Sequence, residues 1–349
     1  MVVTDTAPFP ARKPRVVLAM REELPAGLFT DALWARLEAV AELPSRRALT
    51  SFETEEAQAL LAEAEILLAC WNCPPVTEAV LEAAPHLKMI AYVAASVKPV
   101  VTEAVWARGI LVTSAVAAMA VPVAEFTLAA ILFCQKDTFR FRDRLRATRG
   151  AQGLDSKASW DNPTIGNFGK RIGIVGASHI GRLVIGHLKH FDMEVRVHDP
   201  YLTEAGAERL GVRRMPLMEL LAWADTVSLH APALPATRHM IGREQLAAMR
   251  DGAWLINTAR GWLLDHEALA EECAARRLNA FLDTVLPEPL PPESPLYDMP
   301  NVVITPHMAG AEGNELWRMT ALGLTEIERF LAGEAPLHPV RREDLERIA

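Results

Sequence analysis

The residues of this chain best suited to chemistry are an arginine, a glutamate and a histidine in three separate segments. Arg260 ends LINTAR, Glu288 lies in LDTVLPEP, and His307 ends VVITPH. His307 suits proton transfer because imidazole titrates near neutral pH, and a carboxylate on its other ring nitrogen would fix the tautomer. The guanidinium of Arg260 is a planar fork of donors that matches carboxylate and carbonyl oxygens. Together these groups suit oxidation of a hydroxyl beside a carboxylate, given a hydride acceptor.

Taken singly, each of these three residues also has a structural explanation. Arg260 could form a surface ion pair, Glu288 could be a solvated loop carboxylate, and His307 could be a buried, hydrogen-bonded histidine. An earlier segment favours the chemical interpretation, because it predicts a site for a hydride acceptor.

That segment predicts a nucleotide-binding strand, turn, helix and strand. An apolar run, Ile172–Val175, is followed by a turn with Gly176 and Gly181, a helical pattern and a second strand ending before Asp199, 18 positions after Gly181. In nucleotide-binding proteins with this order of elements, the pyrophosphate lies over the helix N-terminus and the acid accepts hydrogen bonds from ribose hydroxyls. Gly176 permits the tight turn, and Gly181 lets helix and strand pack closely.

One position departs from the usual glycine pattern. Ser178 stands where the middle glycine belongs. Its side chain either points away, or bonds to a phosphate oxygen, or shifts the pyrophosphate and weakens binding. Asp199 would repel a 2′-phosphate, and the following Pro200-Tyr201-Leu202 offers no arginine to accept one, so NAD is favoured over NADP.

Apolar runs of strand length alternate with helical patterns on both sides of this segment. The expected strands are Val16–Ala19, Ile66–Cys70, Met89–Val93, Ile110–Thr113, Ile172–Val175, Glu194–His198, Thr226–Leu229, Trp254–Asn257, Asn279–Leu282 and Val302–Ile304. Such alternation predicts an α/β protein with two doubly wound parallel-sheet domains of the Rossmann or flavodoxin-like kind. We expect a first domain part at 1–118, an inserted nucleotide-binding domain at 119–306, and a return to the first domain at 307–349.

Three further segments have a clear pattern. An apolar helix is expected at Val121–Leu132, with an arginine-rich stretch continuing to Arg149 and a loop from Gly150 to Gly169. A long helix is expected within Glu312–Leu331.

Composition limits the class of protein. The 349 residues are 50% hydrophobic and 23% charged, which is typical of a globular protein large enough for two cores. The net charge of −8 argues against bulk nucleic-acid binding. No apolar run looks long enough to cross a membrane, and the start, MVVTDTAPFPARKPR, lacks an apolar signal core, so we expect a cytoplasmic protein.

Two of the four cysteines, Cys70 and Cys73, have the spacing of a redox or zinc motif. A zinc site would need a second ligand pair, and a thiol–disulfide role would need a thioredoxin-like context. We therefore expect structural thiols and no metal.

The three chemical segments and the glycine turn, in this order, resemble the D-isomer-specific 2-hydroxyacid dehydrogenase family, which includes phosphoglycerate, glycerate and D-lactate dehydrogenases. The resemblance covers nearly the whole chain and is strongest from Lys170 to Gly310. It implies an NAD-dependent enzyme that interconverts a D-2-hydroxy acid and its 2-oxo acid, with two domains closing over substrate and cofactor. It gives His307 the role of acid and base, Glu288 that of its orienting partner, and Arg260 that of the carboxylate and carbonyl ligand. It also implies a homodimer, with Val121–Leu132 and the following arm at the interface.

The resemblance further implies a set of cofactor contacts. They comprise the glycine turn and its acid, the adenine wall after Thr226–Leu229, and the nicotinamide side: Gly176, Ser178, His179, Ile180, Gly181 and Asp199; His230, Pro232 and Thr237; Thr258, Ala259, Arg260, Asp283, His307 and Gly310. Asp283 would bind the nicotinamide carboxamide.

The substrate loop departs from the family pattern. Where the family usually reads A-G-x-G-V-D-N, this chain has Ala94 and Ser96 in place of glycines and Lys98-Pro99 in place of the acid and amide. Backbone amides of Ser96 and Val97 remain candidates for the substrate carboxylate. Lys98 either adds positive charge there or is an ordinary solvated lysine.

Two other functions fit parts of the sequence. One is a dehydrogenase of another small anion, formate or phosphite, although the formate branch typically carries glutamine where this chain has Glu288. The other is an NAD(H)-sensing binding protein of the corepressor type, which would need a peptide-recognition surface. The sequence does not identify the substrate.

Overall fold

The computed structural model describes residues 12–149 and 162–345. The chain divides into two compact units, Met1–Met119 with Ala311–Ala349, and Ala120–Gly310. Residues 307–310 therefore belong to the second unit, whereas the expected boundary assigned them to the returning segment. Residues 1–11 and most of the loop expected at 150–169 lie outside the described residues.

The first unit is built on a parallel sheet. Its strands follow the order β1 (Val16–Ala19), β2 (Ile66–Ala69), β3 (Met89–Tyr92) and β4 (Leu111–Ser114). Nearly every residue of these strands is buried, as expected for a parallel sheet covered on both faces. Isolated parallel bridges join Glu42 to Arg15 and Leu49 to Ala19 on the outer side of β1, so residues 42–49 stand where a flavodoxin-like sheet has its second strand.

Short helices connect these strands, and one long helix returns to them. The helices are α1 (Leu24–Leu28), α2 (Asp31–Val40), α3 (Glu55–Leu61), α4 (Glu78–Ala83), α5 (Glu103–Ala107) and α14 (Leu316–Leu331). Threonine side chains cap α2, α3 and α4 by accepting a backbone N–H of the first turn. In α14, a Cβ on Gly323 would lie 2.3 Å from Val93 Cγ1, so this helix packs directly against the residue after β3.

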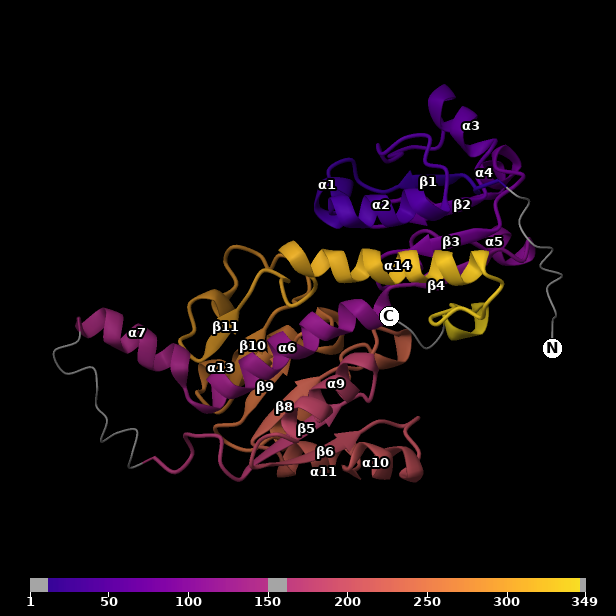
Figure 1. The fold of residues 1–349 in the computed structure, drawn as a ribbon. Helices are drawn as coiled ribbons and strands as arrows, with labels where there is room; N and C mark the ends of the chain where they lie inside the picture. The colour runs from indigo at the N-terminus through magenta and orange to yellow at the C-terminus, as the bar shows by residue number, and fades with distance from the viewer. Residues whose placement is uncertain (1–11, 150–161, 346–349) are drawn as a thin grey trace. The chain divides into compact units, whose positions relative to one another are not determined.

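The second unit has a seven-stranded parallel sheet (Figure 1). Its strands are β5 (Lys170–Val175), β6 (Met193–His198), β7 (Arg213–Arg214), β8 (Thr226–Leu229), β9 (Trp254–Asn257), β10 (Asn279–Leu282) and β11 (Val302–Ile304). They follow the order β11-β10-β9-β8-β5-β6-β7. The chain starts at β5, winds outward to β7, then crosses to β8 and winds the other way. The switch point between β5 and β8 is where doubly wound sheets bind nucleotides.

Helices of the second unit alternate with its strands. They are α9 (His179–Leu188), α10 (Glu204–Leu210), α11 (Leu217–Trp223), α12 (Arg243–Ala248) and α13 (His266–Ala274). The two parallel sheets with alternating helices confirm the predicted α/β fold class. The two-residue strand β7 was not predicted, because it is too short to form an apolar run.

The apolar helix α6 corrects two expectations. It runs over Val116–Gln135 rather than Val121–Leu132, and α7 (Thr138–Thr148) follows it. With 20 residues it is long and apolar enough to cross a membrane by length and composition, so the expectation that no such run exists was wrong. In the structure 44% of an 18-residue apolar window of this helix is buried, with Ala124, Ile131 and Cys134 in the core.

Two glycines of α9 provide a matched test of the close contact at its start. A Cβ on Gly181 would lie 2.1 Å from the carbonyl oxygen of Gly176, whereas a Cβ on Gly186 would meet nothing within 4 Å. We expect Gly181→Ala to lower the free energy of unfolding by about 3 kcal/mol, since backbone must move to make room. Gly186→Ala should raise it by about 0.5–1 kcal/mol through helix propensity. Urea denaturation of both variants checks this, and equal effects would contradict the packing argument.

Candidate functional site

The predicted site residues of the second unit gather at one edge of its sheet. They follow the carboxyl ends of six strands: Gly176 after β5, Asp199 after β6, His230 after β8, Thr258 to Arg260 after β9, Asp283 after β10 and His307 after β11. Carboxyl ends of parallel strands share an edge, so the sheet topology brings these residues together.

The glycine turn lies at the switch point of the sheet. Gly176 has φ +101°, which favours glycine, and a Cβ there would lie 2.6 Å from the backbone nitrogen of Ala231. The turn after β5 therefore packs against the backbone that follows β8, and no larger residue fits at Gly176.

Ser178 is the N-cap of α9. Its Oγ accepts a hydrogen bond from the Gly181 amide at 3.3 Å, so the side chain folds onto the helix start. The amides of Ser178 and Ile180 have no acceptor among the described residues. Such orphan donors at a helix N-terminus fit a pyrophosphate, and the hydroxyl proton of Ser178 is not used by its cap.

Asp199 joins the end of β6 to the glycine turn. Its Oδ2 accepts the Ala177 amide at 2.7 Å, and its Oδ1 accepts the amides of Tyr201 and Leu202 at 2.7 and 3.0 Å. A carboxylate offers about four lone-pair positions, so one remains on Oδ2 for a hydroxyl donor. The residues present fit a dinucleotide, and the ribose contact stays a prediction.

The residues expected at the adenine side form one turn after β8. The hydroxyl of Thr237 donates to the carbonyl of Pro232 at 2.6 Å and accepts the Leu234 amide at 2.9 Å. His230 lies beneath this turn, 3% exposed, with Nε2 2.9 Å from Ser228 Oγ and no partner for Nδ1. Burial lowers the pKa of His230 to about 3, so the ring is neutral at physiological pH.

The turn that carries Arg260 is tightly packed. Its Nη1 donates to the Ala259 carbonyl at 2.6 Å, and burial lowers the pKa of the guanidinium, an effect that the nearby Glu288 opposes. A Cβ on Gly261 would lie 2.1 Å from the carbonyl carbon of Val285, so this turn touches the loop that leads to Glu288. Thr258 is buried, with its Oγ1 2.7 Å from that of Thr127.

His307 and Glu288 are paired in the structure. Nδ1 of His307 lies 2.7 Å from Oε1 of Glu288, and both side chains are about half exposed. A carboxylate accepts only, so Nδ1 carries the proton and Nε2 is the ring atom left for a substrate. His307 has φ +53°, a conformation that costs energy for a non-glycine residue and must be held by its surroundings.

Asp283 provides much of that hold. It is 1% exposed, and its carboxylate accepts the hydroxyl of Thr305 at 2.6 Å and the amides of Met308 and Ala309, both at 2.9 Å. Its carbonyl accepts the His307 amide at 3.0 Å. The residue predicted to bind nicotinamide thus fixes the His307 segment, and one lone-pair position of Oδ2 remains for the predicted carboxamide contact.

The sequence interpretation missed Asn257, the last residue of β9. It is fully buried, and its amide contacts the backbone of the Arg260 turn at both ends. The available signal was a polar amide at the end of an otherwise apolar run, because buried amides need partners.

The predicted substrate loop follows β3 in the first unit. None of the amides of Ala94, Ala95, Ser96 and Val97 has an acceptor among the described residues. Unpaired consecutive amides of this kind can serve as donors to an anion. The lost glycines have therefore not removed the donors. Lys98 next to them is exposed.

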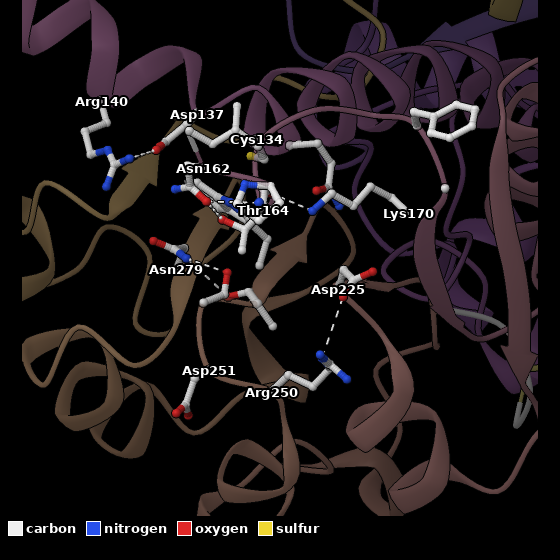
Figure 2. A pocket seen from close by; sticks show the side chains of 18 of the residues that line it. Cys134, Asp137, Arg140, Asn162, Thr164, Lys170, Asp225, Arg250, Asp251 and Asn279 are labelled. Carbon is white, nitrogen blue, oxygen red and sulfur yellow. Dashed lines mark hydrogen bonds and ion pairs between the residues drawn. The ribbon is translucent and has the colours of Figure 1, made fainter. Parts of the chain in front are cut away.

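Two hollows adjoin the sheet of the second unit. One, of about 480 Å³, lies at the opposite edge, around the strand starts marked by Lys170, Asp225 and Asn279 (Figure 2). Two ion pairs line it, Asp137–Arg140 and Asp225–Arg250. The other, of about 510 Å³, borders Glu288 and β11. The predicted chemistry is thus at the edge away from the first hollow.

The four cysteines are free and buried. Burial raises the pKa of both Cys70 and Cys73 to about 12, which leaves these thiols protonated at neutral pH. No cluster of metal-binding side chains occurs in the part of the chain that the structure describes.

Residues 128–309, just over half of the chain, match the model of the D-isomer specific 2-hydroxyacid dehydrogenase NAD-binding domain. The chain belongs to this family. NAD is therefore the dinucleotide of the second unit, as the sequence predicted.

Similar proteins agree with this assignment. The D-3-phosphoglycerate dehydrogenase of Methanocaldococcus jannaschii is 33% identical over 85% of this chain and 55% of its own length. The glyoxylate reductase of Korarchaeum cryptofilum is 33% identical over 77% of this chain and 80% of its own. The crystal structure of the Thermus thermophilus TT0316 protein superposes with a TM-score of 0.69 at 32% identity, covering 94% of this chain and 100% of that one. This family member spans 55–58% of the length of the D-3-phosphoglycerate dehydrogenases it matches.

The buried, neutral His230 should make this family member less stable in acid. The unfolded chain takes up a proton near pH 6.5, whereas the folded state keeps the ring neutral down to about pH 3. Stability from this group is therefore present above pH 6.5 and is lost as the pH falls. The loss between pH 7 and pH 5 should be about 2 kcal/mol. Urea denaturation at both pH values should show a smaller pH dependence for His230→Gln. His190→Gln, which removes an exposed imidazole, is the control, and an equal change in both variants would contradict the prediction.

Proposed function

We propose that this family member is an NAD-dependent oxidoreductase that interconverts a D-2-hydroxy acid and its 2-oxo acid. The observation that carries the proposal is the His307–Glu288 pair at 2.7 Å, on the same sheet edge as Arg260 and the glycine turn. A proton carrier, a cation and a dinucleotide turn are the groups that this reaction needs.

The three side chains divide the work. With Nδ1–H held by Glu288, Nε2 of His307 takes the hydroxyl proton in oxidation and returns a proton in reduction. Glu288 stabilises the imidazolium that forms in between. Arg260 binds the carboxylate and polarises the carbonyl oxygen, and its partial burial strengthens both interactions. The bound nicotinamide supplies or accepts the hydride.

The first unit takes part through the loop after β3. The orphan amides around Ser96 and Val97 support a role as donors to the substrate carboxylate, and Lys98 adds positive charge beside them. The names of the relatives, D-3-phosphoglycerate dehydrogenase and glyoxylate reductase, support a small 2-hydroxy acid as substrate. Glu288 argues against formate as the substrate, because the formate branch of the family typically carries glutamine at this position.

Removal of the proton carrier tests the proposal. We expect His307→Asn to lower kcat for reduction of 2-oxo acids by about 10³-fold, because general acid catalysis is lost. Binding of NADH, followed by nucleotide fluorescence, should change far less than kcat, because His307 is one of many predicted cofactor contacts. Retained turnover would contradict the role of His307. A wild-type chain that binds NADH tightly but reduces no member of a 2-oxo acid panel would instead favour the sensor function.

A homodimer through α6 and α7 is part of the same proposal. Phe133 on α6 and Leu145 on α7 are 52% and 42% exposed, so both segments predicted at the interface present a large apolar side chain, which supports an interface there. Sedimentation should show a dimer at micromolar concentration, and Phe133→Asp should shift it toward monomer by disrupting apolar contact. Met218→Asp, at a 38% exposed position of α11, is the control. A wild-type monomer refutes the dimer.

A further inference from the structure

Asn257 is a polar residue in an apolar position. It ends β9 and is 0% exposed, and its neighbours in register on the adjacent strands are Leu229 and Leu282. An aliphatic side chain would suit this row of the sheet and would need no hydrogen-bond partners. The amide side chain of Asn257 is therefore explained by its hydrogen bonds to the turn after β9.

The side chain of Asn257 closes the turn that carries Arg260. Its Oδ1 accepts the Ala259 amide at 3.1 Å, and its Nδ2 donates to the Arg260 carbonyl at 2.9 Å. Both ends of the amide thus bind backbone within three residues of Asn257. Arg260 Nη1 in turn donates to the Ala259 carbonyl, which belongs to the peptide group between the two that Asn257 binds.

The same residue connects this turn with the His307 segment. The Asn257 carbonyl accepts the Asp283 amide at 2.9 Å. The Asp283 carboxylate then holds the amides of Met308 and Ala309. A continuous chain of buried hydrogen bonds therefore runs from the Arg260 turn to the segment that carries the imidazole.

We propose that Asn257 is a positioning residue for the reaction, which acts through Arg260 by fixing the turn that aims its guanidinium. The inference rests on the proposed function. Asn257 has no role of its own toward the 2-oxo acid. Loss of the amide frees the Ala259–Arg260 backbone, so the guanidinium no longer meets the substrate carboxylate and carbonyl in one fixed geometry. Misplacement of a substrate-binding group lowers both the reaction rate and the affinity for substrate.

The chain offers a matched control in Asn301. It is 8% exposed and likewise binds backbone through its side chain, with Nδ2 donating to the carbonyls of Cys273 and Leu278 at 2.9 and 2.7 Å. It precedes β11, at the edge away from the predicted chemistry. Loss of either amide leaves buried backbone groups unpaired, so Asn257→Ala and Asn301→Ala should lower thermal stability to a similar degree.

The experiment compares these variants for kcat/KM toward a 2-oxo acid, for oxalate binding to the NADH-loaded protein by calorimetry, and for NADH affinity. We expect Asn257→Ala to weaken oxalate binding and kcat/KM by about 10- to 100-fold and to weaken NADH affinity far less, since most of the predicted cofactor contacts lie outside this turn. The isosteric Asn257→Asp, which keeps the acceptor but loses the donor to Arg260, should act in the same direction and guards against a failure of the alanine variant to fold. Asn301→Ala should match wild type in all three measurements.

A double-mutant cycle provides the decisive readout. If Asn257 acts through Arg260, Asn257→Ala should have almost no further effect on oxalate binding or kcat/KM in an Arg260→Ala background. Additive losses overturn the inference, as does an equal loss in Asn301→Ala or a parallel loss of NADH affinity. If the wild-type protein reduces a 2-oxo acid and Asn257→Ala does so equally well, the inference is overturned but the proposed function stands. A wild-type protein that neither reduces a 2-oxo acid nor binds oxalate overturns the proposed function together with it.

Discussion

Direct backbone contact between neighbouring turns is the constraint on which the candidate site depends. At Gly176, Gly181 and Gly261 a single added Cβ would lie 2.6, 2.1 and 2.1 Å from backbone atoms of another turn or of the same one. These distances leave no room for adjustment by side-chain rotation. The turns after β5 and β8 consequently place each other, and so do the turns after β9 and β10. These backbone contacts hold the turns at the carboxyl ends of the strands, and with them the candidate site residues, in fixed positions.

Polar side chains complete that frame by binding groups of the turns, and two of them, Asp283 and Asn257, are buried. Asp199 and Asp283 each accept three hydrogen bonds from turn donors, and Asn257 uses both ends of its amide in the same way. Each such group avoids the cost of burial without a partner, and each fixes one turn. The left-handed backbone of His307 is held in this manner, because the three donors bound by the Asp283 carboxylate all lie within two residues of it. The two acids that the sequence predicts as cofactor contacts are therefore also residues that position the turns.

Much of this was accessible from the sequence, and the reason differs by element. The strand runs are continuous and apolar because a parallel sheet is covered on both faces, so bounds such as Trp254–Asn257 were predicted as they occur. The start of α6 was misplaced because Pro122 is typical of a first helical turn, whereas the helix begins at Val116 and continues through the proline. Asn257 was missed because its partners come after it in the turn, and only the folded backbone shows that both ends of the amide are used.

The departures from the family pattern share one property that explains why they are tolerated. Ser178 replaces a glycine yet caps α9 and leaves two orphan amides at the helix start, and Ala94 and Ser96 replace glycines yet leave four orphan amides after β3, among the described residues. In both places the donors expected to face an anion are backbone groups, which a small side chain does not remove. Recognition of pyrophosphate and carboxylate by backbone is therefore compatible with considerable divergence. Under the proposed function, selection among 2-hydroxy acids would depend on side chains instead, and the exposed Lys98 beside the amide cluster is one place where this chain differs in charge from the family pattern.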